Sequence, residues 1–271
     1  MALTLVATPL GNLDDVSPRV IAALSGADTI AAEDTRVTRR LLAALGLPTP
    51  RLVSYRAQDE QARAVPLADR VHAGEQVVLV TDAGMPGISD PGAQLVALCH
   101  ARGLAVTLAP GPTAVGCAVA ASGFAAVPFH FLGFPPRRSG PLRRWLLAAG
   151  ALQGTLVMYE SPRRTAALVA AAAAVLPGRE ACLCRELTKR HEELLRLPLD
   201  QLAADLAGRD GLKGEVVIVV GPGPAPVAQT EALAEGAGLK PIAAALADRW
   251  GVSRREAYQR LVALERDFTE A

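Results

Sequence analysis

Short apolar runs of four or five residues alternate along the first half of the chain with longer stretches whose apolar positions recur at helical spacing. These runs predict strands that begin at Leu3, Thr29, Arg51, Gln76 and Ala105. The stretches TRRLLAALG and DPGAQLVALCHARG end in glycine, which is favoured immediately after a helix. Because alternating strands and helices are typical of an α/β domain with a largely parallel sheet, we predict such a domain over residues 1–112.

A second series of apolar runs consists of FHFLGF, TLVMYE, ACLCRE and EVVIVV. These runs alternate more strongly and their loops are short, so we predict a second α/β domain over residues 113–222, with a mixed sheet. Proline and glycine in GPGPAPVAQ, from Gly221 to Gln229, predict a linker.

Residues 228–271 predict a small extension of two helices that resembles a helix-turn-helix. Ser253 is the expected N-cap of the second helix, and Glu256 three residues later completes a capping box. Six basic residues stand against seven acidic ones from Ala228 onward. The charge therefore leaves two interpretations open, an accessory docking module and a purely structural cap.

The 271 residues have room for one large domain or two modest ones, and disorder is not expected, because 51% of them are hydrophobic and only 20% are charged. The four cysteines lack C-x-x-C spacing and there are only four histidines, so we expect buried free cysteines and no metal site. The N-terminus lacks the pattern of a signal peptide, and no window approaches the ~20 apolar residues that span a bilayer. We expect a cytoplasmic protein.

Charge is balanced overall but not locally. The formal net charge is +1, whereas the segment from His130 to Arg196 holds eleven Lys and Arg against five Glu. This local excess lies beside the loops discussed next and indicates a polyanionic partner.

Four segments place glycine or proline directly after a predicted strand, at Ala7, Thr81, Ala109 and Tyr159. Ligands of parallel α/β sheets bind beyond the carboxyl ends of the strands, where small residues expose the backbone. One such loop alone indicates only a tight turn, but four together favour a shared cleft. The standard phosphate-binding patterns G-x-x-x-x-G-K-[ST] and G-x-G-x-x-G are absent, so a nucleoside without phosphates, such as S-adenosylmethionine, suits these loops better.

The strings LTLVATPLGNLDDVSPRV, AAEDTRVTRRLL, VTDAGMPGISDPG, APGPTA, FLGFPPR, MYESPRR and RELTKRHEE occur in this order. They resemble the tetrapyrrole methylase superfamily and, within it, the branch of methyltransferases I that act on ribosomal RNA of the small subunit. The resemblance covers about Leu3 to Gly221. It implies a cofactor cleft between two α/β domains, homodimers, and S-adenosylmethionine-dependent 2′-O-methylation of a cytidine in the decoding region of 16S rRNA.

The resemblance also implies which residues contact the methyl donor. These are Pro9, Asp82, Ala83, Gly84, Ile88, Thr113, Ala114 and Tyr159. Asp82 follows a strand, where a carboxylate accepts hydrogen bonds from an amine or a ribose hydroxyl. The chain has D-A-G where corphin methylases have G-D-P, which leaves the partner of Asp82 open.

Methyl transfer to a hydroxyl requires alignment and an acceptor for the hydroxyl proton. The candidates for a catalytic carboxylate are Glu33, Asp34 and Glu160, with His191 as a weaker one. The alternative for each carboxylate is an ion pair with Arg36 or Arg163.

An RNA substrate is held first through its phosphates. Basic residues follow nearly every predicted cleft loop, and the candidates for RNA contact are Arg36, Arg39, Arg137, Arg163, Arg164, Lys189 and Arg190. The aromatic side chains that suit base stacking are Tyr55, Phe134 and Tyr159.

Two other functions remain open from the sequence. The first is methylation of a small tetrapyrrole, which predicts a wide apolar cleft and is disfavoured by the arginine pairs. The second is a non-enzymatic nucleic-acid-binding regulator built on the terminal helices, for which the glycine-rich loops would be expendable.

Overall fold

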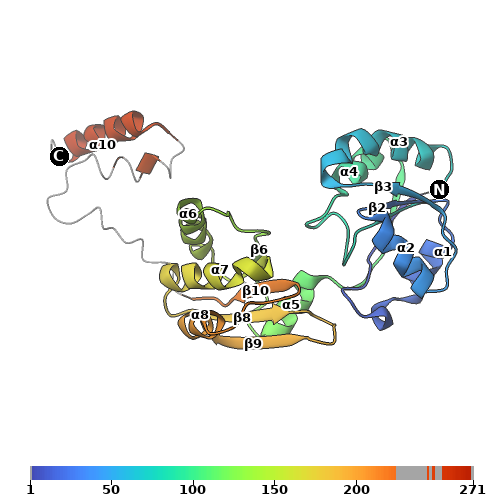
Figure 1. Cartoon of the computed structure of the whole chain (residues 1–271). Coiled ribbons are helices and arrows are strands. Elements are labelled where there is room, and N and C mark those ends of the chain that lie inside the picture. The colour runs from blue at the N-terminus through green and yellow to red at the C-terminus, as the bar shows by residue number, and fades with distance from the viewer. Residues whose placement is uncertain (1, 224–242, 244–245, 248–251, 270–271) are drawn as a thin grey trace. The chain divides into compact units, whose positions relative to one another are not determined.

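The computed structural model describes residues 2–223, 243, 246–247 and 252–269. The chain divides into two compact units, Met1–Pro224 and Ala225–Ala271. The first unit contains two five-stranded sheets (Figure 1). The boundaries predicted at residues 112, 222 and 228 stay predictions.

The first sheet is entirely parallel, with the strand order β3-β2-β4-β1-β5. Its strands are β1 (Ala2–Val6), β2 (Thr29–Ala32), β3 (Arg51–Ser54), β4 (Val77–Val80) and β5 (Ala105–Ala109). All residues of β2 and β4 are buried, because helices cover both faces of the sheet. The strands predicted from the apolar runs of the first half are thus confirmed.

Helices of the first sheet pack in pairs. They are α1 (Pro18–Ser25), α2 (Thr35–Ala44), α3 (Glu60–His72) and α4 (Ala93–Ala101), with 3-10 turns η1 (Leu13–Asp15) and η2 (Ala57–Asp59). Buried side chains of α1 and α2 join one apolar cluster, and those of α3 and α4 join another, so one pair covers each face (Figure 1). Ser17 caps α1 by accepting a hydrogen bond from Val20 N at 3.3 Å.

The second sheet is mixed, as predicted, with the order β6-β7-β10-β8-β9. Its strands are β6 (Phe129–Phe131), β7 (Thr155–Glu160), β8 (Glu180–Arg185), β9 (Glu193–Pro198) and β10 (Val216–Val220). Only β6 and β7 pair in parallel, and the other neighbours are antiparallel. The edge strand β9 was not among the strands that the sequence predicted.

Four helices cover the second sheet: α5 (Ala114–Ser122), α6 (Ser139–Gly150), α7 (Pro162–Val175) and α8 (Leu199–Ala207). Buried residues of α6, α7 and α8 share one cluster, and those of α5 share another with the opposite face. The cysteines are free, and Cys99, Cys182 and Cys184 are buried as expected.

The second unit contains α10 (Arg254–Thr269). Ser253 accepts a hydrogen bond from Glu256 N at 3.2 Å, which confirms the predicted N-cap. Ala257 packs with Ala243 and Ala247. Most of the predicted linker and of the first predicted helix lies outside the described residues. In the part of the chain that is described, no helix has both the length and the apolar character needed to cross a membrane.

Candidate functional site

A cavity of about 370 Å³ lies where loops of the first sheet meet the second sheet. Leu10, Glu33 and the segment after β4 line it from the first sheet. The ends of β7, β8 and β10 line it from the second, together with Phe134, Leu187 and the N-terminus of α5. The loops after β1, β2 and β4 reach the cavity because the carboxyl ends of parallel strands share one edge of a sheet.

Four of the predicted donor-binding residues line the cavity: Asp82, Ala83, Ala114 and Tyr159. The others lie in the same loops but are absent from its walls. Gly84 forms a bridge with Thr8, with N···O distances of 2.9 and 3.0 Å, and so ties the loop after β4 to the loop that contains Pro9.

The remaining two predicted donor-binding residues are Thr113 and Ile88. Thr113 caps α5 by accepting a hydrogen bond from Gly116 N at 3.1 Å, whereas Ile88 is 49% exposed. Donor contact by all eight residues stays a prediction.

Five carboxylates line the cavity, namely Glu33, Asp82, Asp90, Glu160 and Glu215. Glu33 Oε2 accepts a hydrogen bond from Thr81 Oγ1 at 2.6 Å and a longer one from Asp82 N at 3.4 Å. Burial raises the pKa of Asp82 and of Asp90, and the negative charge of Glu33 raises both further. The cavity therefore favours a ligand that carries positive charge.

Asp34 is held by its own helix. Its side chain accepts hydrogen bonds from Arg36 N at 2.8 Å and from Arg36 Nη2 at 2.6 Å, and so caps α2. These bonds to Arg36 lower the pKa of Asp34 far below its usual range. A carboxylate with such a low pKa is a weak proton acceptor, so the geometry agrees with the alternative of an Arg36 pair.

Glu160, at the end of β7, is buried and faces the cavity. Its Oε1 accepts hydrogen bonds from Ser161 N at 2.7 Å and from Ser161 Oγ at 3.2 Å. Its Oε2 lies 3.1 Å from Arg164 Nη2 as an ion pair, although no hydrogen bond of ordinary geometry reaches that oxygen. The partner is thus Arg164, and the alternative of a pair with Arg163 is wrong.

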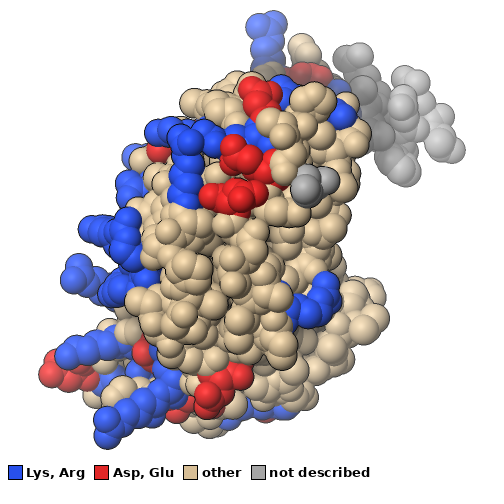
Figure 2. Space-filling view, turned by 90° about the vertical axis from the view of Figure 1, so that its right-hand side faces the viewer, with Lys and Arg blue, Asp and Glu red and all other residues tan. Residues whose placement is uncertain are grey.

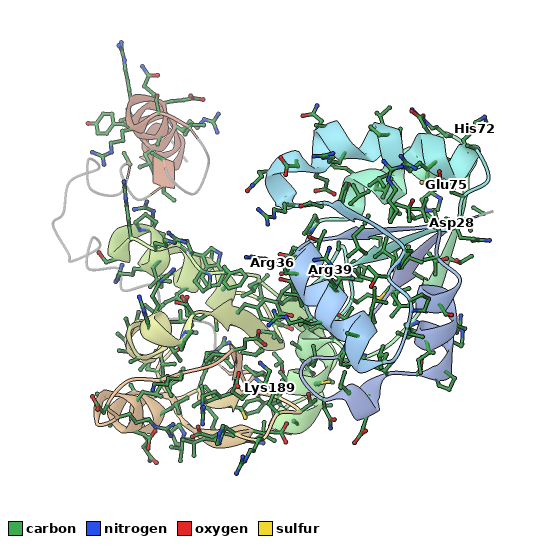
Figure 3. All side chains as sticks on the ribbon, turned by 45° about the vertical axis from the view of Figure 1, so that its right-hand side comes forward. Asp28, Arg36, Arg39, His72, Glu75 and Lys189 are labelled. Carbon is green, nitrogen blue, oxygen red and sulfur yellow. The ribbon has the colours of Figure 1, made fainter. Side chains whose placement is uncertain are left out.

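The candidate basic residues fall into two groups. Side chains of Arg39, Arg137, Arg163 and Arg190 are exposed, and within the described residues they form neither hydrogen bonds nor ion pairs. Arg36, Arg164 and Lys189 form internal ion pairs. Figure 3 places Arg36 and Arg39 on α2 and Lys189 in the loop between β8 and β9. RNA contact by any of them stays a prediction.

Lys189 connects the two sheets. Its ammonium pairs with Glu186 at 3.0 Å and with Glu215 at 3.1 Å, while its alkyl chain crosses Gly11. A Cβ on Gly11 would lie 2.7 Å from Lys189 Cε and closer still to Cγ. Gly11 also has φ +157°, so both the backbone and the lysine require glycine here.

We expect Gly11→Ala to lower the free energy of unfolding by roughly 2–3 kcal/mol, because the Lys189 chain must move and the backbone is strained. Urea unfolding measures the loss. Gly46→Ala is the matched control: Gly46 has φ +67°, but nothing lies within 4 Å of its Cβ position. It should cost only about 1 kcal/mol. Equal losses in the two variants would show that contact with Lys189 contributes nothing.

Sequence reasoning missed several residues of the cavity. Asp90 lies in the same glycine-rich loop as Asp82, while Leu10, Leu187 and Glu215 come from three other segments. Tyr55 was a candidate for base stacking, but its side chain is fully buried and its hydroxyl donates to Glu60 Oε1 at 3.3 Å. That interpretation of Tyr55 is wrong.

A second, open hollow of about 450 Å³ is lined by Asp28, Thr29, Arg51, Arg70, Ala73, Gly74 and Glu75. Figure 3 shows Asp28 and Glu75 at the opposite end of the first sheet from Arg36 and Arg39. Glu75 accepts hydrogen bonds from Thr29 Oγ1 at 2.8 Å and from Arg70 Nη1 at 2.9 Å. Since its charges are largely satisfied internally, this hollow is a weaker candidate. No group of residues suited to a metal ion occurs in the described part of the chain.

Comparisons with known proteins agree with this geometry. A profile of the family Tetrapyrrole (Corrin/Porphyrin) Methylases matches residues 2–203. A Mycobacterium bovis protein named ribosomal RNA small subunit methyltransferase I is 47% identical over 233 residues, which cover 85% of this chain and 81% of that protein. A Synechocystis protein of the same name is 37% identical over 278 residues, which cover 98% and 99%.

Solved structures show the same fold. The crystal structure of uroporphyrin-III C-methyltransferase from Thermus thermophilus, complexed with S-adenosylhomocysteine, aligns with a TM-score of 0.56 at 18% identity. The alignment covers 82% of this chain and 97% of that chain. It confirms the predicted α/β fold class.

Proposed function

Because the chain belongs to the tetrapyrrole methylase family, we propose that it transfers a methyl group from S-adenosylmethionine to the ribose 2′-hydroxyl of a cytidine in 16S rRNA of the small ribosomal subunit. The observation that carries the proposal is the carboxylate-lined cavity at the ends of both sheets, in a chain whose relatives are named ribosomal RNA small subunit methyltransferase I. Arg39, Arg137, Arg163 and Arg190 have no partner within the described residues, and they lie in loops and helices that follow β2, β6, β7 and β8.

The cavity fits this donor in its charge and its walls. S-adenosylmethionine supplies a methyl group activated by a sulfonium, and it carries a second positive charge on its amino group. Glu33, Asp82 and Asp90 present negative charge to the cavity, and apolar walls at Leu10, Leu187 and elsewhere suit an adenine ring. These three carboxylates repel one another, and a cation that binds between them relieves the repulsion.

Within the site, we assign the carboxylates different tasks. Asp82 and Asp90 bind the positive groups of the donor. Glu33 fixes the strand end by accepting hydrogen bonds from Thr81 and Asp82. Glu160 is the proposed acceptor of the hydroxyl proton, because the residue lines the cavity and its buried Oε2 accepts no hydrogen bond of ordinary geometry. Asp34 positions α2 and thereby the arginines on it.

The RNA is held by arginines around the cavity. Arg39, Arg137, Arg163 and Arg190 are the favoured phosphate contacts, because no described side chain neutralises them. Figure 2 shows Lys and Arg gathered along one margin of the face in view, while the middle of that face is uncharged. Such an uneven distribution on a chain of net charge +1 supports a phosphate-binding edge.

We expect donor affinity to rise as the pH rises through the range in which Asp82 and Asp90 lose their protons. Asp82 and Asp90 have raised pKa values in the free protein, so both bind protons at pH values where an exposed aspartate is already ionised. A cationic ligand favours their ionised forms, and binding at low pH must therefore release protons. Calorimetry in two buffers that differ in ionisation enthalpy measures both affinity and proton release. Affinity that increases on acidification would contradict this prediction.

The function is tested by incubating the protein with methyl-labelled S-adenosylmethionine and small ribosomal subunits that lack the modification. Label should appear in 16S rRNA, at a cytidine whose 3′ linkage becomes resistant to alkali. Transfer to a uroporphyrinogen instead would support the tetrapyrrole alternative. A protein that binds RNA but not S-adenosylmethionine would support the regulator alternative.

Two associated expectations remain proposals. Homodimer formation is supported by the open edge strand β5, where Leu108 is 51% exposed. We also propose that the protein acts in the cytoplasm, because its proposed substrate is the ribosomal subunit.

A further inference from the structure

Phe134 exposes a large aromatic ring beside the cavity. The residue is 64% exposed and also lines the cavity wall. Two other aromatic side chains are unsuited to the same task. Tyr55 is fully buried, and the ring of Phe124 is covered by the Arg196 guanidinium at 4.1 Å. An exposed ring at this place indicates contact with a ligand, because an aromatic side chain is stabilised by covering both of its faces.

Contacts with strand β7 hold the Phe134 ring in position. It packs against the ring of Tyr159 at a centroid distance of 5.5 Å, and Tyr159 packs against Phe131 at 4.8 Å, both at an interplanar angle of 63°. The preceding Gly133 has φ +65° and its carbonyl accepts a hydrogen bond from Tyr159 N at 2.9 Å. A turn bonded to the central part of the sheet therefore presents the ring.

The segment after the ring is also fixed. Arg164 Nη2 donates to Pro136 O at 2.9 Å while its guanidinium pairs with Glu160. These two contacts explain why the Arg164 side chain is half-buried and does not extend into solvent. A ring that is rigid before its ligand arrives loses little conformational entropy on binding.

Two cationic side chains follow the ring in the sequence. Arg137 and Arg138 follow Pro136 directly, both are exposed, and their side chains form no hydrogen bond or ion pair within the described residues. An exposed aromatic ring followed three and four residues later by arginines suits a nucleotide, whose base stacks and whose phosphate binds a cation. An apolar ligand would not require the arginines, and a free phosphate would not require the ring.

We propose that Phe134 is the stacking platform for the base of the nucleotide whose ribose is methylated, with Arg137 and Arg138 holding the adjoining phosphate. The proposal rests on the proposed function and names the subsite that it requires. A nucleotide whose ribose enters an enzyme cavity leaves its own base stack, and an aromatic side chain replaces part of the lost stacking.

The test compares Phe134→Ala with Phe134→Trp and Phe134→Leu on small ribosomal subunits at saturating S-adenosylmethionine. Phe134→Ala should lower kcat/KM by about tenfold or more. Phe134→Trp should keep activity within about threefold, because it retains a π-face, whereas Phe134→Leu should behave like alanine. The affinity for S-adenosylmethionine, measured by calorimetry without RNA, should stay within about twofold in all three.

Phe129→Ala is the matched control, because Phe129 is 44% exposed but does not line the cavity. It should retain the wild-type kcat/KM. The inference is overturned if Phe134→Ala keeps full activity, if leucine restores it as well as tryptophan, or if donor affinity falls with the ring. An inactive wild-type protein would instead refute the proposed function, so the two failures are distinguishable.

Discussion

Asp82→Asn is expected to weaken S-adenosylmethionine binding by roughly a hundredfold. Asp82 faces the cavity from the loop after β4, and its burial makes a charge-assisted hydrogen bond to the donor strong. Asparagine keeps the size of the side chain and an oxygen that accepts the hydrogen bond from Asp34 N, now 3.1 Å long. The substitution therefore removes the charge without removing the local structure. Calorimetry measures the affinity directly.

The same variant should unfold at an equal or higher temperature. Because the pKa of Asp82 is raised in the folded protein, its ionised form is disfavoured there, and its contribution to stability is lost as the pH rises through that pKa. Removing the charge at neutral pH relieves repulsion with Glu33. Asp210→Asn, an identical change at an exposed loop position, should alter neither quantity. Unchanged donor affinity in Asp82→Asn would show that the loop after β4 does not bind the donor.

The cluster of carboxylates in the cavity does not stabilise the fold when no ligand is bound. Glu33, Asp82 and Asp90 repel one another, and burial makes the repulsion stronger. In contrast, the internal pairs of Lys189 with Glu186 and Glu215 stabilise the opposite wall. The cavity thus combines a stable frame with a destabilised charged surface, which is the usual arrangement at functional sites.

The sequence predicts strands well where burial makes them continuously apolar. VVLV and VVIVV became the fully buried β4 and β10. It does not predict β9, Glu193–Pro198, because this edge strand mixes charged and apolar residues and ends in proline. Its place is fixed by pairing with β8 from Glu180 to Arg185, which is a contact that local patterns do not contain.

Side-chain direction limits the prediction of the site. Asp82 and Asp90 lie in one loop, but only its fold, with glycines of positive φ at Gly84, Gly87 and Gly92, brings Asp90 back to the cavity. Similarly, Arg163 and Arg164 are neighbours on α7 and point in directions about 100° apart. Arg164 reaches Glu160 four residues earlier, while Arg163 stays exposed. Local sequence shows the pair of arginines but not this division of roles.

Glu160→Gln is expected to lower kcat for methylation of small subunits by about 10²- to 10⁴-fold, with donor affinity within about threefold of the wild type. The loss follows if Glu160 accepts the hydroxyl proton, because glutamine retains the size of the side chain but is not a base. Single-turnover kinetics at saturating donor and subunit measure the methyl-transfer step itself. Calorimetry of the same variant separates this loss from weakened donor binding.

The ion pair with Arg164 requires controls, because Glu160 is only 4% exposed and the pair also fixes the turn at Pro136. Arg164→Met removes the pair but leaves the carboxylate, so it should destabilise the fold while retaining more activity than Glu160→Gln. Glu33→Gln changes a second carboxylate of the cavity and should cost less in kcat. If Arg164→Met and Glu160→Gln lose equal activity, then Glu160 acts only by holding Arg164 and the turn, and another carboxylate of the cavity takes the proton.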